Sequence, residues 1–209
     1  MAFHATKQRV LNRGVPPDSF LQQMIDWGKT APDEIFVPNP HADIYSNVIG
    51  MLGPWQGIRH RRAVMLEVMR VLAGFESSWD WNAGVDTTNP TSTTPDTIEA
   101  GAWQVSANSM GFGQELKDLV LNKVGSLNGD DFQQAMKQDH QLAMEYIARL
   151  LRRTVNHNGP VKRHEIDSWL RNAVVRCSGK RGLVKLMQLS KSGARPLPTL
   201  RDSTTEEAG

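Results

Sequence analysis

Glu76 is the residue whose position suggests chemistry most directly. It follows an apolar stretch that predicts a buried helix, and it precedes Ser77-Ser78-Trp79-Asp80-Trp81. The negative end of the helix dipole disfavours a carboxylate there, and neighbouring indoles would desolvate it, so we expect its pKa to rise. A carboxyl group that holds its proton near neutral pH can protonate a leaving glycosidic oxygen. The alternative is a solvated glutamate at a fraying helix end.

Helices are expected to position this residue, so the predicted fold class is mainly α. Apolar residues recur at helical spacing from about Arg59 to Gly74, and their near-continuous run predicts a central helix buried on most sides. The polar stretch between Trp79 and Phe112 predicts a long functional loop. Further helices are expected at about 20–27 with Asp18 as its N-cap, 113–124, 130–155 ended by Asn158-Gly159-Pro160, and 165–175.

The 209 residues suffice for one domain with its own core and extensions. We expect an N-terminal helix and wrapping loop at 1–57, the main domain at 58–175, and a basic, flexible tail at 176–209. The tail holds seven Lys/Arg and three Asp/Glu, so its net charge is +4. Because the whole chain has a net charge of +2, residues 1–175 have a net charge of −2. A nucleic-acid-binding domain places positive charge on its folded surface. Nucleic acid is therefore not an expected partner, although Lys162-Arg163-His164 keeps that alternative open.

Other features of the sequence bear on targeting, membrane insertion, cysteine chemistry and metal binding. The first thirty residues lack the basic start and apolar run of a secretory signal, and no stretch is long enough to span a membrane. Cys177 is the single cysteine, which we interpret as a free thiol. Neither a metal nor a cofactor is expected, because His140, His157 and His164 show no recognised ligand spacing.

Three separated elements resemble, in order, the motifs of the lysozyme-like superfamily of goose-type lysozymes and soluble lytic transglycosylases. They are Glu76-Ser77 at a helix end, Gly101-Ala102-Trp103-Gln104-Val105 against the family's Gly-Leu-Met-Gln, and the helix Ala143-Met144-Glu145-Tyr146-Ile147. Ala102-Trp103 departs from the second motif. Val155-Asn156-His157-Asn158-Gly159-Pro160 departs from the family's Ala-Tyr-Asn-x-Gly, which would form the distal wall of the cleft.

The resemblance covers roughly residues 60–160 and implies a role for each matching residue. Glu76 would be the catalytic acid and Ser77 a sugar contact. Gly101 would make a tight turn that lines the cleft, and Gln104 would bind the N-acetyl sugar. Tyr146 would orient or polarise Glu76. Trp79, Trp81 and Trp103 are either sugar-stacking surfaces or core residues, because tryptophan serves both purposes.

A second carboxylate would decide the reaction. An inverting hydrolase needs one to activate water, whereas a transglycosylase lets the sugar's own 6-hydroxyl form a 1,6-anhydro product. Asp86, Asp96 and Glu99 lie on the loop between the first two motifs, and we favour Glu99 or Asp86 for this role. Ser106 stands where related enzymes can carry another aspartate.

The resemblance implies a muramidase-like hydrolase that cleaves the β-1,4 bond between N-acetylmuramic acid and N-acetylglucosamine in peptidoglycan. A lytic transglycosylase and a non-catalytic glycan-binding module are the alternatives. We expect synthesis in the bacterial cytoplasm without a signal peptide and action on the periplasm or cell wall of a target cell. This context favours an antibacterial type VI secretion effector, with a cognate immunity protein as partner, over a phage lysin.

Overall fold

Helix α4 (Ile58–Ser77) is the longest helix in the computed structural model, which describes residues 6–37, 39, 43–54, 57–85 and 90–176. Nearly every side chain between His60 and Gly74 is buried. This confirms the predicted central helix and extends it to Ser77. The chain is mainly helical, and the described residues contain one isolated antiparallel bridge, between Ala100 and Val105.

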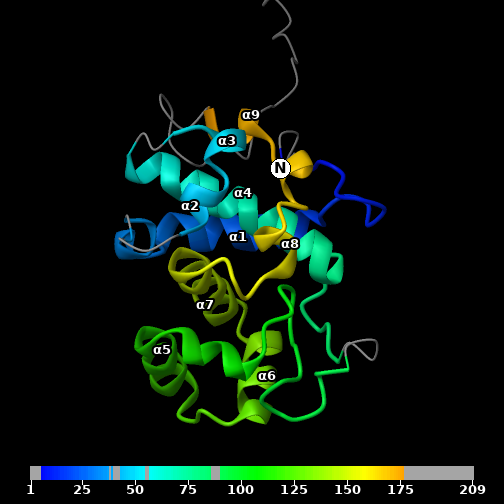
Figure 1. Cartoon of the computed structure of the whole chain (residues 1–209), viewed down its shortest axis with the longest axis vertical. Coiled ribbons are helices and arrows are strands. Elements are labelled where there is room, and N and C mark those ends of the chain that lie inside the picture. Colours follow the sequence, from blue (N-terminus) through cyan, green and yellow to red (C-terminus); the bar gives the residue numbers. More distant parts are fainter. Residues whose placement is uncertain (1–5, 38, 40–42, 55–56, 86–89, 177–209) are drawn as a thin grey trace, which may run out of the picture.

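The helices form two groups that α7 (His140–Arg153) joins (Figure 1). Elements α1, α2, α3, α8 and α9 gather around α4, whereas η2, α5 and α6 form the other group. Helix α7 contacts elements of both groups, including α1, α4, α5 and α6. The bounds are α1 Asp18–Thr30, η1 Asp33–Phe36, α2 Ile44–Asn47, α3 Ile49–Leu52, η2 Ala107–Phe112, α5 Gln114–Val124, α6 Gly129–Gln138, α8 Gly159–Lys162, η3 Asp167–Trp169 and α9 Asn172–Arg176.

The structure corrects several predicted helix boundaries. The helix expected at 130–155 is two helices that meet at Asp139, whose carboxylate accepts from the Leu142 N–H and caps α7. Asn158-Gly159-Pro160 does not end α7 but begins α8, where Pro160 needs no N–H donor. The helix expected at 165–175 is the short η3 followed by α9. Pro17, not Asp18, is the N-cap of α1.

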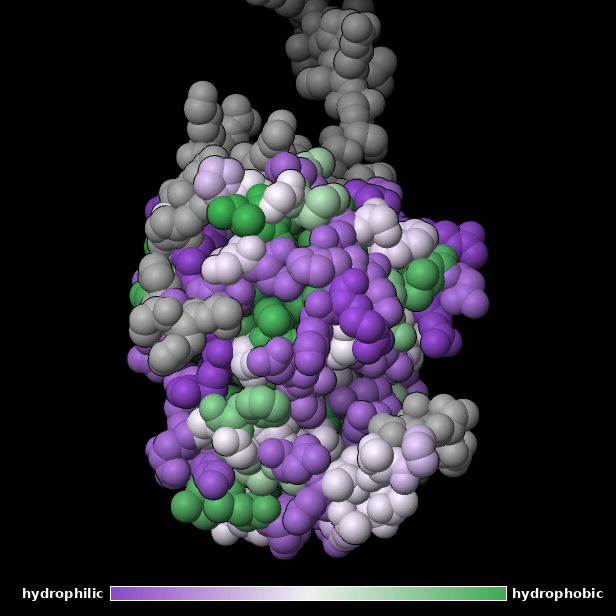
Figure 2. Space-filling model, viewed as in Figure 1, coloured by the Kyte–Doolittle hydropathy of each residue, from purple (hydrophilic) through white to green (hydrophobic). Residues whose placement is uncertain are grey.

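One hydrophobic core runs through the described chain, from Val10 to Val175, and the N-terminal segment shares it with the helices that follow. Of the predicted tail, only Arg176 belongs to the described residues. The visible face is mainly hydrophilic with separate hydrophobic patches (Figure 2). Among the described helices, none is both long and apolar enough to cross a membrane.

A buried ion pair on α4 ties the N-terminal segment and the 169–171 segment to the central helix. Arg70 donates to both Glu67 carboxylate oxygens at 2.7 and 2.8 Å, and both side chains are fully buried. Arg70 also donates to the carbonyls of Gln8 and Trp169, while Glu67 accepts from the Arg171 N–H. Glu67 and Arg70 were not predicted, because charged residues three apart on a helix are typical of an exposed face.

Candidate functional site

Helix α4 ends in an unusual backbone conformation directly after Glu76 and Ser77. Ser78 and Trp79 both have positive φ, 60° and 64°, which costs a residue with a Cβ on the order of 1 kcal/mol each. The Ser78 and Trp79 N–H groups donate to the carbonyls of Gly74 and Ala73, respectively. Glu76 itself is half-buried at this helix end.

The Gly101–Gln104 motif forms the predicted tight turn. Ala100 and Val105 exchange both backbone hydrogen bonds, at 2.9 and 3.2 Å, and thereby close a four-residue loop. Gly101 and Gln104 both have positive φ, 73° and 45°. The Gln104 side-chain amide donates to the Gly101 carbonyl at 3.0 Å, so one of its donors stabilises the turn.

Ser77 joins the helix end to this turn. Its hydroxyl lies 2.8 Å from the Ala102 carbonyl oxygen, across 25 residues of sequence, and it also accepts from the Asp80 N–H. The two sequence motifs are therefore neighbours in space. We call Glu76, Ser77 and the 100–105 turn the helix-end site. Because its hydroxyl bonds these backbone groups, Ser77 has a structural role beside the predicted sugar contact.

Gly101→Ala should destabilise the protein by about 1–3 kcal/mol, because alanine is strained at positive φ and its Cβ would lie 2.7 Å from the Met136 carbonyl oxygen. Urea unfolding of the variant measures this loss. Gly111→Ala is the control, since nothing lies within 4 Å of a Cβ at Gly111. Equal unfolding free energies for the two variants would contradict the tight packing of the turn against α6.

The structure places two of the three predicted tryptophans in the core. Trp103 is 2% exposed and its indole N–H donates to the Met69 carbonyl, which does not fit the expected sugar-stacking role. Trp79 is also buried, and it donates to the Arg70 carbonyl and packs on Gly74. Gly74 lies about 200° around the helix from Glu76. The Trp79 indole therefore packs on a different side of α4 from the carboxylate it was expected to desolvate.

Tyr146 has a different partner from the predicted one. Its hydroxyl lies 2.6 Å from Ser109 Oγ, and Ser109 Oγ lies 2.6 Å from the Ser106 carbonyl. Because a hydroxyl has one proton, Ser109 donates to Ser106 and Tyr146 donates to Ser109. Burial raises the pKa of the Tyr146 phenol. With its proton used in this chain of bonds, Tyr146 anchors η2 to α7 and does not donate to Glu76.

The predicted second carboxylates differ in how the structure places them. Glu99 is half-buried and directly precedes Ala100 of the turn. Asp96 is exposed, and its backbone carbonyl accepts from the Asn108 N–H. Asp86 lies outside the described residues.

Arg163 is a neighbour of Glu76 that sequence reasoning did not select. Its guanidinium pairs with Glu165 at 2.7 Å. That hydrogen bond, and then the charges of Glu165 and Glu76, raise the pKa of Arg163. His164, the next residue, also has positive φ, 59°. The Lys-Arg-His run that first suggested nucleic acid therefore contributes a cation near the helix-end site.

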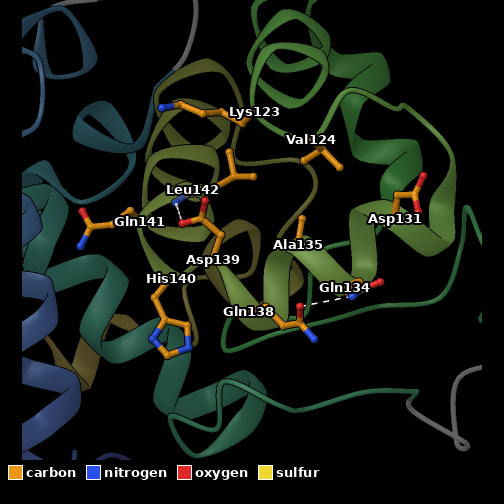
Figure 3. Close-up of a pocket in the computed structure, with 10 residues that line it drawn as sticks. All are labelled: Lys123, Val124, Asp131, Gln134, Ala135, Gln138, Asp139, His140, Gln141 and Leu142. Atoms are coloured by element: carbon orange, nitrogen blue, oxygen red, sulfur yellow. Dashed lines mark hydrogen bonds between the residues drawn. The ribbon is translucent and has the colours of Figure 1, made fainter.

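The large surface hollow lies elsewhere, between α5, α6 and the start of α7 (Figure 3). It measures about 670 Å³ and is open to solvent. Amide and charged side chains line much of it, among them Gln134, Gln138 and Lys123. None of the described residues that line this hollow is a predicted site residue. The described part of the whole chain holds no cluster of three or more His, Cys, Asp or Glu that could bind a metal ion.

Acidification should destabilise the fold through three histidines. Burial lowers the pKa values of His60, His140 and His157, whereas an unfolded histidine titrates near about 6.5. Below that pH the unfolded chain binds more protons than the native one, so stability falls as pH falls. Urea unfolding at about pH 7.5 and about pH 5.5 measures the loss. His157→Gln should reduce it, and a pH-independent unfolding free energy would contradict this account.

No family model matches the chain, and neither a curated protein nor a solved structure matches it.

Proposed function

We propose that the protein is a peptidoglycan glycosidase with a lysozyme-like fold, in which Glu76 is the general acid. The observation that carries this proposal is the 2.8 Å hydrogen bond from Ser77 to Ala102, which brings the Glu-Ser and Gly-x-x-Gln elements together. The chain resembles the lysozyme-like superfamily in these same two elements. Residues with a strained backbone conformation are often found at functional sites. Ser78, Trp79 and Gln104 have such a conformation here, with positive φ.

In this mechanism Glu76 donates its proton to the glycosidic oxygen between N-acetylmuramic acid and N-acetylglucosamine. Glu99 or Asp86 then activates the water that attacks the sugar, and Gln104 binds the N-acetyl group with the amide atoms that the turn leaves available.

Digestion of purified sacculi tests the proposal. The protein should release soluble disaccharide muropeptides, which chromatography and mass spectrometry identify. Reducing ends would establish a hydrolase, whereas a uniform loss of water to 1,6-anhydro ends would establish a lytic transglycosylase. If a control lysozyme releases products and this protein releases none, the glycosidase proposal fails and a glycan-binding module replaces it.

The biological setting belongs to the same proposal. We propose an antibacterial effector that acts on the cell wall of a target cell and that a cognate immunity protein inhibits by covering the cleft. Periplasmic targeting of the protein in a susceptible bacterium should cause lysis, and cytoplasmic expression should not.

A further inference from the structure

The large hollow between α5, α6 and the start of α7 offers groups to a ligand that the helix-end site does not use. Its volume of about 670 Å³ lies within the roughly 300–1,000 Å³ of ordinary ligand sites. Val124, Ala135 and Leu142 contribute apolar side chains to its lining, and the other lining residues carry charged, imidazole or amide side chains. The hollow can therefore cover the apolar part of a ligand and bind its polar groups.

Two glutamines on successive turns of α6 offer one donor and one acceptor to this hollow. Both side chains are exposed and belong to its lining. Gln134 Nε2 donates to Gln138 Oε1 at 3.2 Å. This bond leaves Gln134 Oε1 to accept from a ligand and Gln138 Nε2 to donate to it. A peptide bond presents the complementary pair, because each unit has one N–H and one C=O.

Two opposite charges complete the hollow. Lys123 of α5 and Asp131 of α6 lie on opposite sides of it (Figure 3). The Lys123 side chain is exposed to solvent. Asp131 accepts from Asn128 Nδ2 at 2.6 Å through one carboxylate oxygen, so its other oxygen can bind a cation. The two charges suit a ligand that has a carboxylate on one side and an ammonium group on the other.

The same lining disfavours the two other polymers that bind open hollows, a nucleic acid and a glycan. The Asp131 and Asp139 carboxylates would repel phosphate groups. His140 supplies the one ring among the described lining residues, and the Trp81 ring stacks on it with the ring centres 3.9 Å apart. One face of this ring is therefore already covered, and a sugar would find little aromatic surface to stack on.

We propose that this hollow binds a short peptide that carries an ammonium group and a terminal carboxylate. The carboxylate pairs with Lys123, and the ammonium group pairs with Asp131. A peptide unit between them bonds Gln134 and Gln138. Such a peptide has two sources: the stem peptide of peptidoglycan, which contains D-amino acids, or an ordinary all-L peptide. Only the first source rests on the glycosidase proposal.

NMR titration of the isotopically labelled full chain tests the site with two peptides, L-Ala-γ-D-Glu-L-Lys-D-Ala-D-Ala and its all-L isomer Ala-Glu-Lys-Ala-Ala. We expect saturable shifts of the backbone amides of Val124, Gln134 and Leu142, with a Kd on the order of 1 mM for the better ligand. Tighter binding of the first peptide identifies the stem peptide as the source, and equal or tighter binding of the second identifies an ordinary peptide. The titration needs no turnover, so its outcome is independent of whether the protein cleaves sacculi.

Two lysines of α5 provide matched variants. Lys123→Gln should weaken binding of the better peptide about tenfold, because a hydrogen bond between charged groups is lost. Lys117→Gln should leave binding unchanged, since Lys117 is exposed on the same helix but is not among the lining residues. Amidation of the peptide's C-terminus should weaken wild-type binding about tenfold and should not weaken binding to Lys123→Gln any further.

The neighbouring aspartates of α6 test the ammonium group in the same way. Asp131→Asn should weaken binding about tenfold, whereas Asp130→Asn, at an exposed residue outside the lining, should not. Replacement of the peptide's lysine by norleucine should abolish this difference. The proposal is overturned if neither peptide gives saturable shifts at the three amides, or if Lys123→Gln binds as Lys117→Gln does. A β-1,4-linked N-acetylglucosamine trimer that shifts these amides at lower concentration than either peptide would also overturn it, in favour of a glycan.

Discussion

Glu76→Gln should reduce muropeptide release from sacculi at least a hundredfold, because a glutamine amide has no proton to give to the leaving oxygen. General acid catalysis contributes about 10²–10⁴-fold to rate. The variant should still fold, since the side chain is half-buried at a helix end and glutamine has nearly the same shape. It should also still bind sacculi, because the amide keeps the contacts that hold the glycan. Product quantification by chromatography, with a co-sedimentation assay for binding, measures both effects.

Glu34→Gln is the matched control, since Glu34 is an exposed glutamate that pairs with Arg149 at the surface. It should release products at the wild-type rate. Glu99→Gln extends the experiment to the second carboxylate. If Glu99 activates water, its loss should also suppress hydrolysis, whereas a transglycosylase would retain 1,6-anhydro products. Wild-type product release by Glu76→Gln would contradict the role of Glu76 in catalysis.

The elements with a local signal in the sequence were predicted well. The long apolar run predicted α4, whereas the tight turn at Gly101 was expected from the resemblance to the family's Gly-x-x-Gln motif. The break between α6 and α7 was missed because neither glycine nor proline marks it. Asp139 makes the break instead, as the N-cap from which α7 starts. Sequence patterns identify such caps poorly when both flanking segments continue the same apolar period.

The side-chain partners were not predictable in the same way. Ser77 meets Ala102 and Tyr146 meets Ser109 only after the chain has folded, across 25 and 37 residues. A tryptophan such as Trp103 fits a glycan surface or a core equally well, and its burial depends on which helices cover it. The sequence therefore identified the neighbourhood of the site better than the partner of each residue.

Glu67→Gln should lower the free energy of unfolding by about 3–5 kcal/mol, because it leaves the Arg70 guanidinium buried without its counter-charge. This is a large fraction of the roughly 5–15 kcal/mol that stabilises an ordinary domain. The loss should extend to the segments around Gln8, Trp169 and Arg171, which bond the same pair. Urea unfolding measures the total, and hydrogen exchange at these backbone amides locates it.

The double variant Glu67→Leu with Arg70→Met distinguishes the effect of the buried charges from the effect of the volume that the two side chains fill. Removing both charges avoids an uncompensated buried ion, so the double variant should be more stable than either single variant. It should remain below wild type to the extent that the Gln8, Trp169 and Arg171 backbone groups lose their partners. Glu34→Gln, in the exposed pair with Arg149, should cost no more than about 1 kcal/mol. A similarly small loss for Glu67→Gln would show that water or a rearranged α4 relieves the buried charge, and would remove this pair as the anchor of the central helix.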